Sequence, residues 1–178
     1  MRKTVLAAAV CLVIPFSCLV AQQSSNEQKE KAGSLAAKCP MHNEHSKMNE
    51  RGEKGMGFSQ SATTHHFLLK PNGGVIQVEV NDAGDATNRD NIRMHLKHIA
   101  QAFSNGDFEI PMFVHDTVPP GVPEMKRLRE KIRYSFEETA NGARVVIATT
   151  DKDTLAAVHQ FLRFQIEEHK TGDPIESN

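Results

Sequence analysis

The segment Asn91–Asp116 brings three histidines into a stretch that should fold. His95 and His98 stand one helical turn apart, and His115 follows after a short loop. Because residues three apart are neighbours on a helix surface, the two imidazoles of the helix could reach one ion or one ligand. His95 borders the apolar stripe of that helix, which comprises Ile92, Leu96, Ile99 and Phe103. An equally open interpretation is a half-buried histidine satisfied by water or a carbonyl.

Further donors flank this helix on both sides. His65 and His66 open a predicted strand, and because strand side chains alternate between faces, one of the two should face the helix layer. Met112 and His115 would lie on opposite faces of a regular strand, so one of them should contribute. An imidazole-rich set suits Cu(II) or zinc, and a thioether donor favours copper. The predicted set is His95, His98, His115 and one of His65 and His66, with Met112 as a soft fourth donor.

A second group of donors lies in a polar segment nearer the N-terminus. Thiolate and thioether ligands are soft and imidazole is borderline, so together they suit Cu(I) best, with zinc as the competitor. Met56 adds one more soft donor beside a glycine-rich stretch. The alternative is a flexible tail with methionines and histidines that bind nothing. The donors of this segment are Cys39, Met41, His42, His45 and Met48.

The N-terminus predicts export. Two basic residues precede an apolar run from Val5 to Val20, which is typical of a signal peptide cleaved near Ala21. The residues before Cys18 make a poor lipoprotein signal, so a lipid anchor is the less favoured alternative. Cys39 would then be the only cysteine of the mature chain, which excludes an intramolecular disulfide. We expect a periplasmic or secreted protein without a transmembrane segment in its mature form.

Composition divides the remainder of the chain into three parts. Residues 22–62 are polar and have almost no large aliphatic side chains, so the sequence predicts a disordered tail. Residues 63–172 carry the folding signals, and residues 173–178 should again be disordered. The formal net charge of -1 gives no argument for nucleic acid as a partner.

The folded part reads as one pattern used twice. The first copy is a hairpin that turns at Asn72–Gly73 and then a helix from about Asn88 to Ser104. The second is a hairpin that turns at Asn141–Gly142 and then a helix over Lys152–His169. We predict an α+β fold, in which duplicated ββα units form a four-stranded antiparallel sheet with helices packed on one face. Between the copies the sequence predicts an extended segment at residues 111–116 and a short charged helix at 124–131.

An alignment of the helix of the first copy with that of the second suggests a role for the two histidines. His95 falls on Phe161 and His98 on Phe164. Large aromatic side chains are costly to leave in water, so that side of the second helix should be covered. Imidazoles in equivalent positions would need partners to offset their desolvation, which favours a ligand role. His159 and His169 we interpret as surface residues.

Two resemblances add to this interpretation. The unit Cys39-Pro40-Met41-His42 resembles the CPMH core of heavy-metal-binding modules attached to bacterial copper-export systems, which implies copper as cargo. The longer pattern MGF, TTHHF, IRMHLKHIA and PMFVHD resembles a group of poorly characterised exported bacterial proteins. Such proteins sometimes carry the label aspartate carbamoyltransferase, which does not fit, because this chain is far shorter and lacks a Ser-Thr-Arg-Thr phosphate-binding run.

The sequence therefore predicts an exported transition-metal-binding protein, with copper first and zinc second, for storage, delivery or detoxification in the cell envelope. An envelope copper protein would be its partner, and a homodimer through the side of Phe161 and Phe164 is left open. The alternative is an interaction module for a protein or a small apolar ligand, with histidines that are structural or tune binding by pH. A small metal-dependent hydrolase or oxidase is a third class, although no known catalytic motif is present in the sequence.

Overall fold

The computed structural model describes residues 40–177, with side chains from residue 46 onward. Apart from the first turn of helix α2, these residues belong to one unit, Glu44–Asn178. The predicted signal peptide, residues 1–21, and Cys39 lie outside the described residues.

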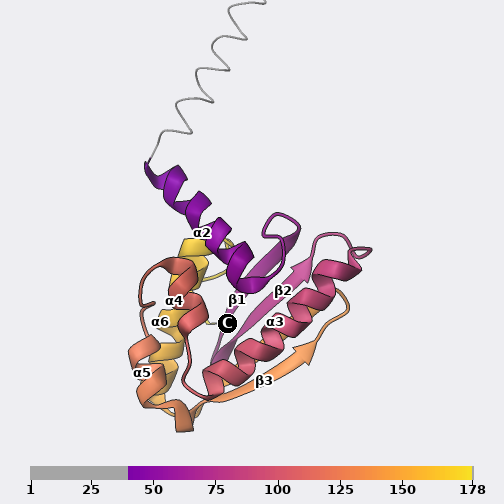
Figure 1. Cartoon of the computed structure of the whole chain (residues 1–178). Coiled ribbons are helices and arrows are strands. Elements are labelled where there is room, and N and C mark those ends of the chain that lie inside the picture. The colour runs from indigo at the N-terminus through magenta and orange to yellow at the C-terminus, as the bar shows by residue number, and fades with distance from the viewer. Residues whose placement is uncertain (1–39, 178) are drawn as a thin grey trace, which may run out of the picture. The chain divides into compact units, whose positions relative to one another are not determined.

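Two hairpin–helix units are joined by a helical connection and preceded by one further helix (Figure 1). The elements are α2 (Pro40–Met56), β1 (Thr63–Lys70), β2 (Gly73–Val80), α3 (Ala86–Ser104), α4 (Glu109–His115), α5 (Val122–Arg127), a 3-10 turn (Arg129–Lys131), β3 (Arg133–Glu138), β4 (Gly142–Ala148) and α6 (Lys152–His169).

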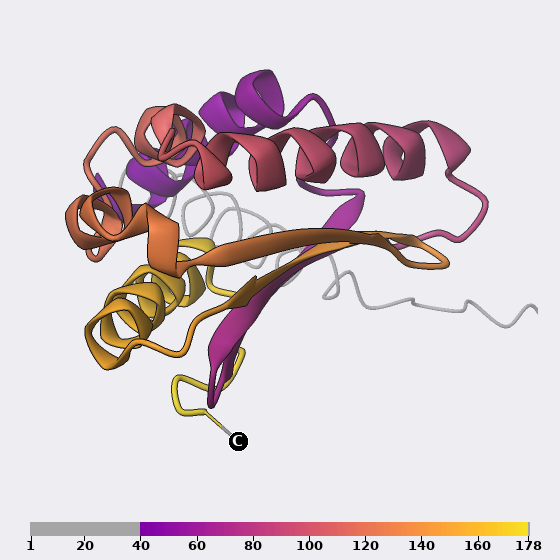
Figure 2. The same ribbon diagram turned by 90° about the horizontal axis from the view of Figure 1, so that it is seen from below.

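All strand pairs are antiparallel, and the sheet order is β1-β2-β4-β3. The two hairpins therefore meet in the middle of the sheet through β2 and β4. This arrangement confirms the prediction of an α+β fold made of duplicated ββα units. Figure 2 shows the twisted sheet with α3 lying along it. In β4 the side chains alternate between the two faces of the sheet. Ala143, Val145 and Ile147 are buried, whereas Arg144 is exposed.

Both repeat helices, α3 and α6, begin with an aspartate as N-cap. The side chain of Asp85 accepts a hydrogen bond from the Asn88 amide, and that of Asp151 accepts one from the Thr154 amide. An aspartate in this position satisfies one of the amides that lack a partner inside a helix. The cap places the start of α3 at Ala86, two residues before the predicted start. Its end is as expected, since Gly106 follows with a positive φ of 77°.

The core lies between the sheet and the two repeat helices. Phe103 of α3 meets Phe161 of α6 edge to face, with ring centroids 5.9 Å apart. Phe108, which precedes α4, stacks on Phe103 at 4.3 Å and is fully buried. Both repeat helices therefore share one face of the sheet, and the chain that connects the units helps to close the space between them.

The structure differs from the disorder predicted for residues 22–62. Pro40–Met56 is a helix despite its polar composition, and Met48 and Phe58 are both 4% exposed. The Arg51 Nε donates a hydrogen bond of 2.8 Å to the carbonyl oxygen of Val114 in α4. This segment gains its order from tertiary contacts that its composition does not reveal. The first part of the predicted tail lies outside the described residues.

Two shorter segments also differ from prediction. Residues 111–116 were expected to be extended, but Glu109–His115 forms helix α4. Pro111 stands in its first turn, where a missing amide costs nothing because that amide has no partner inside the helix. At the other end of the chain, Asp173 was placed in a disordered terminus. Its carboxylate instead accepts one hydrogen bond of 2.9 Å from the Phe67 amide and pairs at 2.9 Å with the Nδ1 of His66.

Candidate functional site

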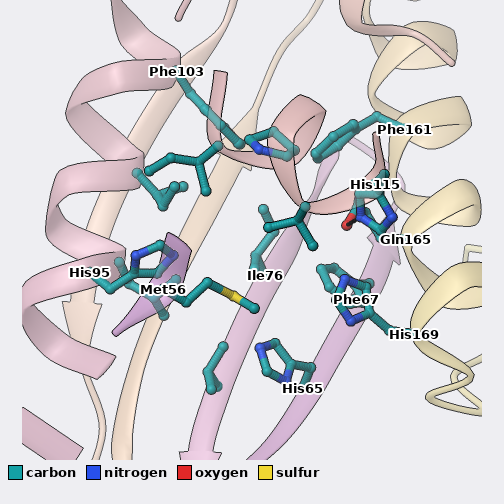
Figure 3. Close-up of a pocket in the computed structure, with 16 residues that line it drawn as sticks. Met56, His65, Phe67, Ile76, His95, Phe103, His115, Phe161, Gln165 and His169 are labelled. Carbon is teal, nitrogen blue, oxygen red and sulfur yellow. Dashed lines mark hydrogen bonds between the residues drawn. The ribbon is translucent and has the colours of Figure 1, made fainter. Parts of the chain in front are cut away.

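A small cavity lies between α3 and α6, above β1 and β2, and is bordered by α4 and the end of α2 (Figure 3). The space inside it amounts to about 60 Å³. Its walls are mostly apolar, but four histidines, one glutamine and one methionine also face it. The apolar wall includes Phe67, Ile76, Leu96, Ile99, Phe103 and Phe161, and the other side chains are Met56, His65, His95, His115, Gln165 and His169.

His65 and His95 form one end of the cavity. His65 projects from β1 towards the helix layer, and its buried Nε2 has no hydrogen-bond partner. His95 projects from α3, at the border of the apolar stripe. Both rings contact the ring of Phe58, at centroid distances of 5.8 Å and 5.6 Å. Both imidazoles therefore contact the same buried aromatic ring.

Burial keeps both of these histidines neutral. It lowers the pKa of His65 to about 4, and the neighbouring His66 lowers it further. Burial also lowers the pKa of His95 to about 4, with smaller contributions from His65 and His98. A neutral imidazole has one nitrogen with a free lone pair. At neutral pH each ring can therefore accept a hydrogen bond or bind a metal ion through that nitrogen.

Met56 is the last residue of α2 and completes this end of the cavity. Figure 3 shows its side chain extending into the cavity, at the end where His95 and His65 lie. A thioether is a weak hydrogen-bond acceptor but a good ligand for soft metal ions. The sequence marked Met56 only as one more soft donor in a flexible tail. Its role at the cavity depends on the helical order of α2.

His115 and Gln165 form the opposite end. The side chain of His115 is 1% exposed, and its Nε2 lies 3.0 Å from the Gln165 Oε1. Its Nδ1 lies 3.9 Å from an oxygen of Glu168. Burial lowers the pKa of His115, although the Gln165 hydrogen bond and the Glu168 charge act in the opposite direction. The buried Nε2 of Gln165 has no partner.

His169, the last residue of α6, links the two ends. Its ring stacks on that of His65 with centroids 5.4 Å apart and meets the ring of His115 edge to face at 5.1 Å. The interpretation of His169 as a surface residue is therefore wrong. Its spacing could have revealed this, because His169 follows the buried Gln165 and Phe161 at intervals of four residues, which keeps it on the core side of the helix.

The cavity includes some of the predicted donors of the folded part and excludes others. It brings together His65, His95 and His115, as the sequence predicted. His98 is exposed and does not line the cavity, because it stands further round the helix than His95. His66 points to the other face of β1, where it pairs with Asp173. Met112 is half-buried in α4 and lies outside the cavity lining.

The donors of the N-terminal segment are only partly described. Cys39 lies outside the described residues, and the side chains of Met41, His42 and His45 also lie outside the described part. Met48 is buried in α2, although the sequence predicted a disordered tail at this position. The hypothesis of a soft-metal site in this segment stays a prediction.

No protein-family model, no curated protein and no solved structure matches this chain. Function must therefore be argued from the cavity itself. None of the helices in residues 40–177 is long and apolar enough to cross a membrane.

The chemistry of the cavity is that of a soft, neutral donor set. Within the described residues, no three His, Cys, Asp or Glu side chains are grouped so that they could hold a metal ion by themselves. The donor end instead combines two imidazoles with the thioether of Met56. Two nitrogens and one sulfur, all uncharged, suit a soft metal ion of low charge better than a hard divalent ion.

Proposed function

We propose that this protein binds a transition-metal ion, copper first, in the cavity between α3 and α6, through His65, His95 and Met56. The observation that carries the proposal is the buried Nε2 of His65, which has no hydrogen-bond partner and faces the same cavity as the other two donors. A buried polar group without a partner costs about 1–3 kcal/mol. A metal ion at this position would remove that cost.

The donor types support copper over zinc. Zinc sites in proteins are tetrahedral and built from thiolate, imidazole and carboxylate. The lining of the cavity includes neither a carboxylate nor a cysteine among the described residues. Thioether and imidazole together favour copper. Zinc remains the weaker competitor in this proposal.

The size of the cavity supports an ion over a larger guest. About 60 Å³ has room for an ion and a few water molecules, whereas pockets for drug-sized ligands measure about 300–1,000 Å³. The apolar walls favour a second candidate, a very small apolar molecule held beside the histidines. Such a ligand would leave the lone pair of His65 without a partner, which is why we place it second.

The biological role that fits this proposal is storage, delivery or detoxification of copper in the cell envelope. The signal peptide that the sequence predicts would place the protein there. The predicted soft-metal segment overlaps α2, and Met56 is the last residue of that helix. In this proposal the segment captures the ion and the cavity holds or receives it. An envelope copper protein would supply or receive it.

Replacing the thioether tests this assignment. We expect Met56→Leu, which keeps the size and apolar character of the side chain, to weaken copper binding at least tenfold, equivalent to about 1.4 kcal/mol. Zinc affinity should change by less than a factor of three, because the two imidazoles remain. The measurement is a competition titration of the purified mature chain against chromogenic chelators, with copper supplied as Cu(I) without oxygen.

Met112→Leu is the matched control for this substitution. Met112 lies in α4, half-buried and outside the cavity lining, so its replacement should leave both affinities unchanged. If Met56→Leu and Met112→Leu bind copper as tightly as the unmodified protein does, the thioether is not a ligand and the assignment fails.

A further inference from the structure

Gln165 carries a buried hydrogen-bond donor at the cavity. It lies on α6, is 4% exposed and lines the cavity together with His115 (Figure 3). Its Oε1 lies 3.0 Å from the Nε2 of His115. Among the described residues, the buried Nε2 of Gln165 has no hydrogen-bond partner. An amide nitrogen donates hydrogen bonds and accepts none, so a guest that satisfies it must carry an acceptor atom.

The ion of the proposed function would bring a charge that the cavity lining does not cancel. His65 and His95 are neutral, because burial lowers the pKa of each to about 4, and the thioether of Met56 is uncharged. A Cu(I) ion bound by these three donors keeps its single positive charge. No Asp, Glu, Lys or Arg among the described residues lines the cavity. Burial of an isolated charge among apolar walls is costly, and a nearby counter-charge has its largest effect where water is excluded.

Two charged side chains lie near the cavity without lining it. Glu168 has an oxygen 3.9 Å from the Nδ1 of His115, and its side chain is 48% exposed. Arg51 donates a hydrogen bond to the carbonyl oxygen of Val114. Glu168 raises the pKa of His115 and Arg51 lowers it, so charges of opposite sign act at this end. Neither of them supplies a counter-charge inside the cavity.

The cavity has room for a second guest beside the ion. Its space is about 60 Å³, and a water-sized guest needs about 10–15 Å³. Gln165 and the proposed copper ligands line this same small space, so an anion at Gln165 would be a near neighbour of the ion. A halide would cancel the charge of Cu(I). A divalent oxyanion such as sulfate would reverse it and would need more donors than one amide provides.

We propose that the cavity takes up Cu(I) together with one small monovalent anion of halide type, and that the Gln165 amide holds this anion beside the ion by a hydrogen bond. The inference rests on the proposed function, because the ion must itself be bound by His65, His95 and Met56. The pair of ion and anion is neutral, so its burial is less costly than that of the ion alone. Copper affinity therefore depends on the halide concentration.

A chelator competition at several chloride concentrations tests this dependence. The chelator is one whose Cu(I) complex is coordinatively saturated and takes no halide, and sodium perchlorate keeps the ionic strength constant. Complexes of free Cu(I) with chloride then cancel, because protein and chelator draw on the same free ion. Since one anion enters with each ion, the exchange constant should rise about tenfold for each tenfold increase in chloride, until the anion position is saturated.

Bromide retention gives a second readout on the unmodified protein. The mature chain is loaded with Cu(I) in bromide buffer without oxygen, desalted, and analysed for copper and bromine. We expect about one bromide for each copper, and no bromide in apo protein treated in the same way, because the anion is held only as the partner of the ion.

Gln165→Glu tests the role of the amide. This substitution keeps the shape of the side chain and an oxygen towards His115, but it replaces the donor by a negative charge. We expect the chloride dependence to disappear and the Cu(I) affinity without halide to rise about fivefold or more, because the carboxylate now cancels the charge of the ion. Gln101→Glu is the matched control. Gln101 is exposed on α3 and outside the cavity, so this variant should keep the chloride dependence of the unmodified protein.

The outcomes separate this inference from the proposed function. If the unmodified protein binds Cu(I) with the same exchange constant at every chloride concentration and retains no bromide, the companion anion is refuted while copper binding stands. A chloride dependence that persists in Gln165→Glu refutes the role of the amide. If that variant does not fold, Gln165→Met takes its place and should also lose the dependence. If the unmodified protein binds no copper at any chloride concentration, both the proposed function and this inference fail.

Discussion

We expect the double substitution His65→Phe/His95→Phe to abolish copper binding. The apo protein should stay as stable as before or become more stable. Removing two of three ligands should weaken affinity by at least a hundredfold, equivalent to about 2.7 kcal/mol. Stability should rise by about 1 kcal/mol, because two half-buried imidazoles with lowered pKa values are replaced by apolar rings of similar size.

The repeat supports this expectation. Phe161, which aligns with His95, lines the same cavity from α6 and is 1% exposed. An aromatic ring is therefore already accommodated at the equivalent position of the second helix. Chemical denaturation and a copper titration on the same preparation would measure both effects.

His98→Phe is the matched control on the same helix. His98 is exposed and outside the cavity, so this substitution should change neither copper affinity nor stability beyond about 0.5 kcal/mol. A double variant that loses several kcal/mol of stability would show that the two histidines hold the fold together and are not kept for a ligand.

The second large effect is a loss of stability in mild acid by the apo protein. The pKa of His65 and that of His95 are each lowered from 6.5 to about 4. As the pH falls below 6.5 the unfolded chain takes up protons that the folded chain refuses, so stability decreases. The contribution of these two histidines is fully present above about pH 7, is lost progressively between pH 6.5 and 4, and does not change further below about pH 4.

Each histidine should contribute about 2 kcal/mol to this loss, a value reduced because both residues keep part of their surface in solvent. His115, whose pKa is also lowered, acts with the same sign. The carboxylates of Asp151 and Asp173 have pKa values below their usual range, so the stability that they contribute is lost at lower pH. The window between pH 6.5 and 4 thus isolates the histidines.

Urea unfolding at a series of pH values measures this profile without metal. We expect the His65→Phe/His95→Phe variant to have a much flatter profile in the same window, while His98→Phe should follow the unmodified protein. A variant profile as steep as that of the unmodified protein would mean that proton uptake by these two rings does not cause the loss of stability.

Local patterns in the sequence are sufficient for the elements that repeat. The two hairpins have Asn-Gly turns, and Asp151 caps a helix whose apolar positions recur at helical spacing. These signals depend on residues close together in the chain, so the fold class and the bounds of α6 could be predicted. The alignment of His95 with Phe161 correctly indicated that His95 is covered, but the matching expectation for His98 was wrong, because His98 is exposed.

The order of α2 and the set of residues that line the cavity depend on contacts between segments that are distant in the sequence. Helix α2 is polar, and its order comes from partners such as the Val114 carbonyl, which lies 63 residues from Arg51 along the chain. Without α2, neither Met56 nor Phe58 could be placed beside His95. The run at residues 109–115 has no clear period, so its helix was mistaken for an extended segment. The choice between His65 and His66 turned on which face of β1 each occupies, which strand alternation alone does not decide.

The most direct test of the copper site is an X-ray absorption spectrum of the mature protein, loaded with one equivalent of copper under reducing conditions and passed through a desalting column. We expect retained Cu(I) with one sulfur and two nitrogen ligands, and loss of the sulfur signal in Met56→Leu. A spectrum with only nitrogen and oxygen ligands, or a protein that retains no copper, would contradict it.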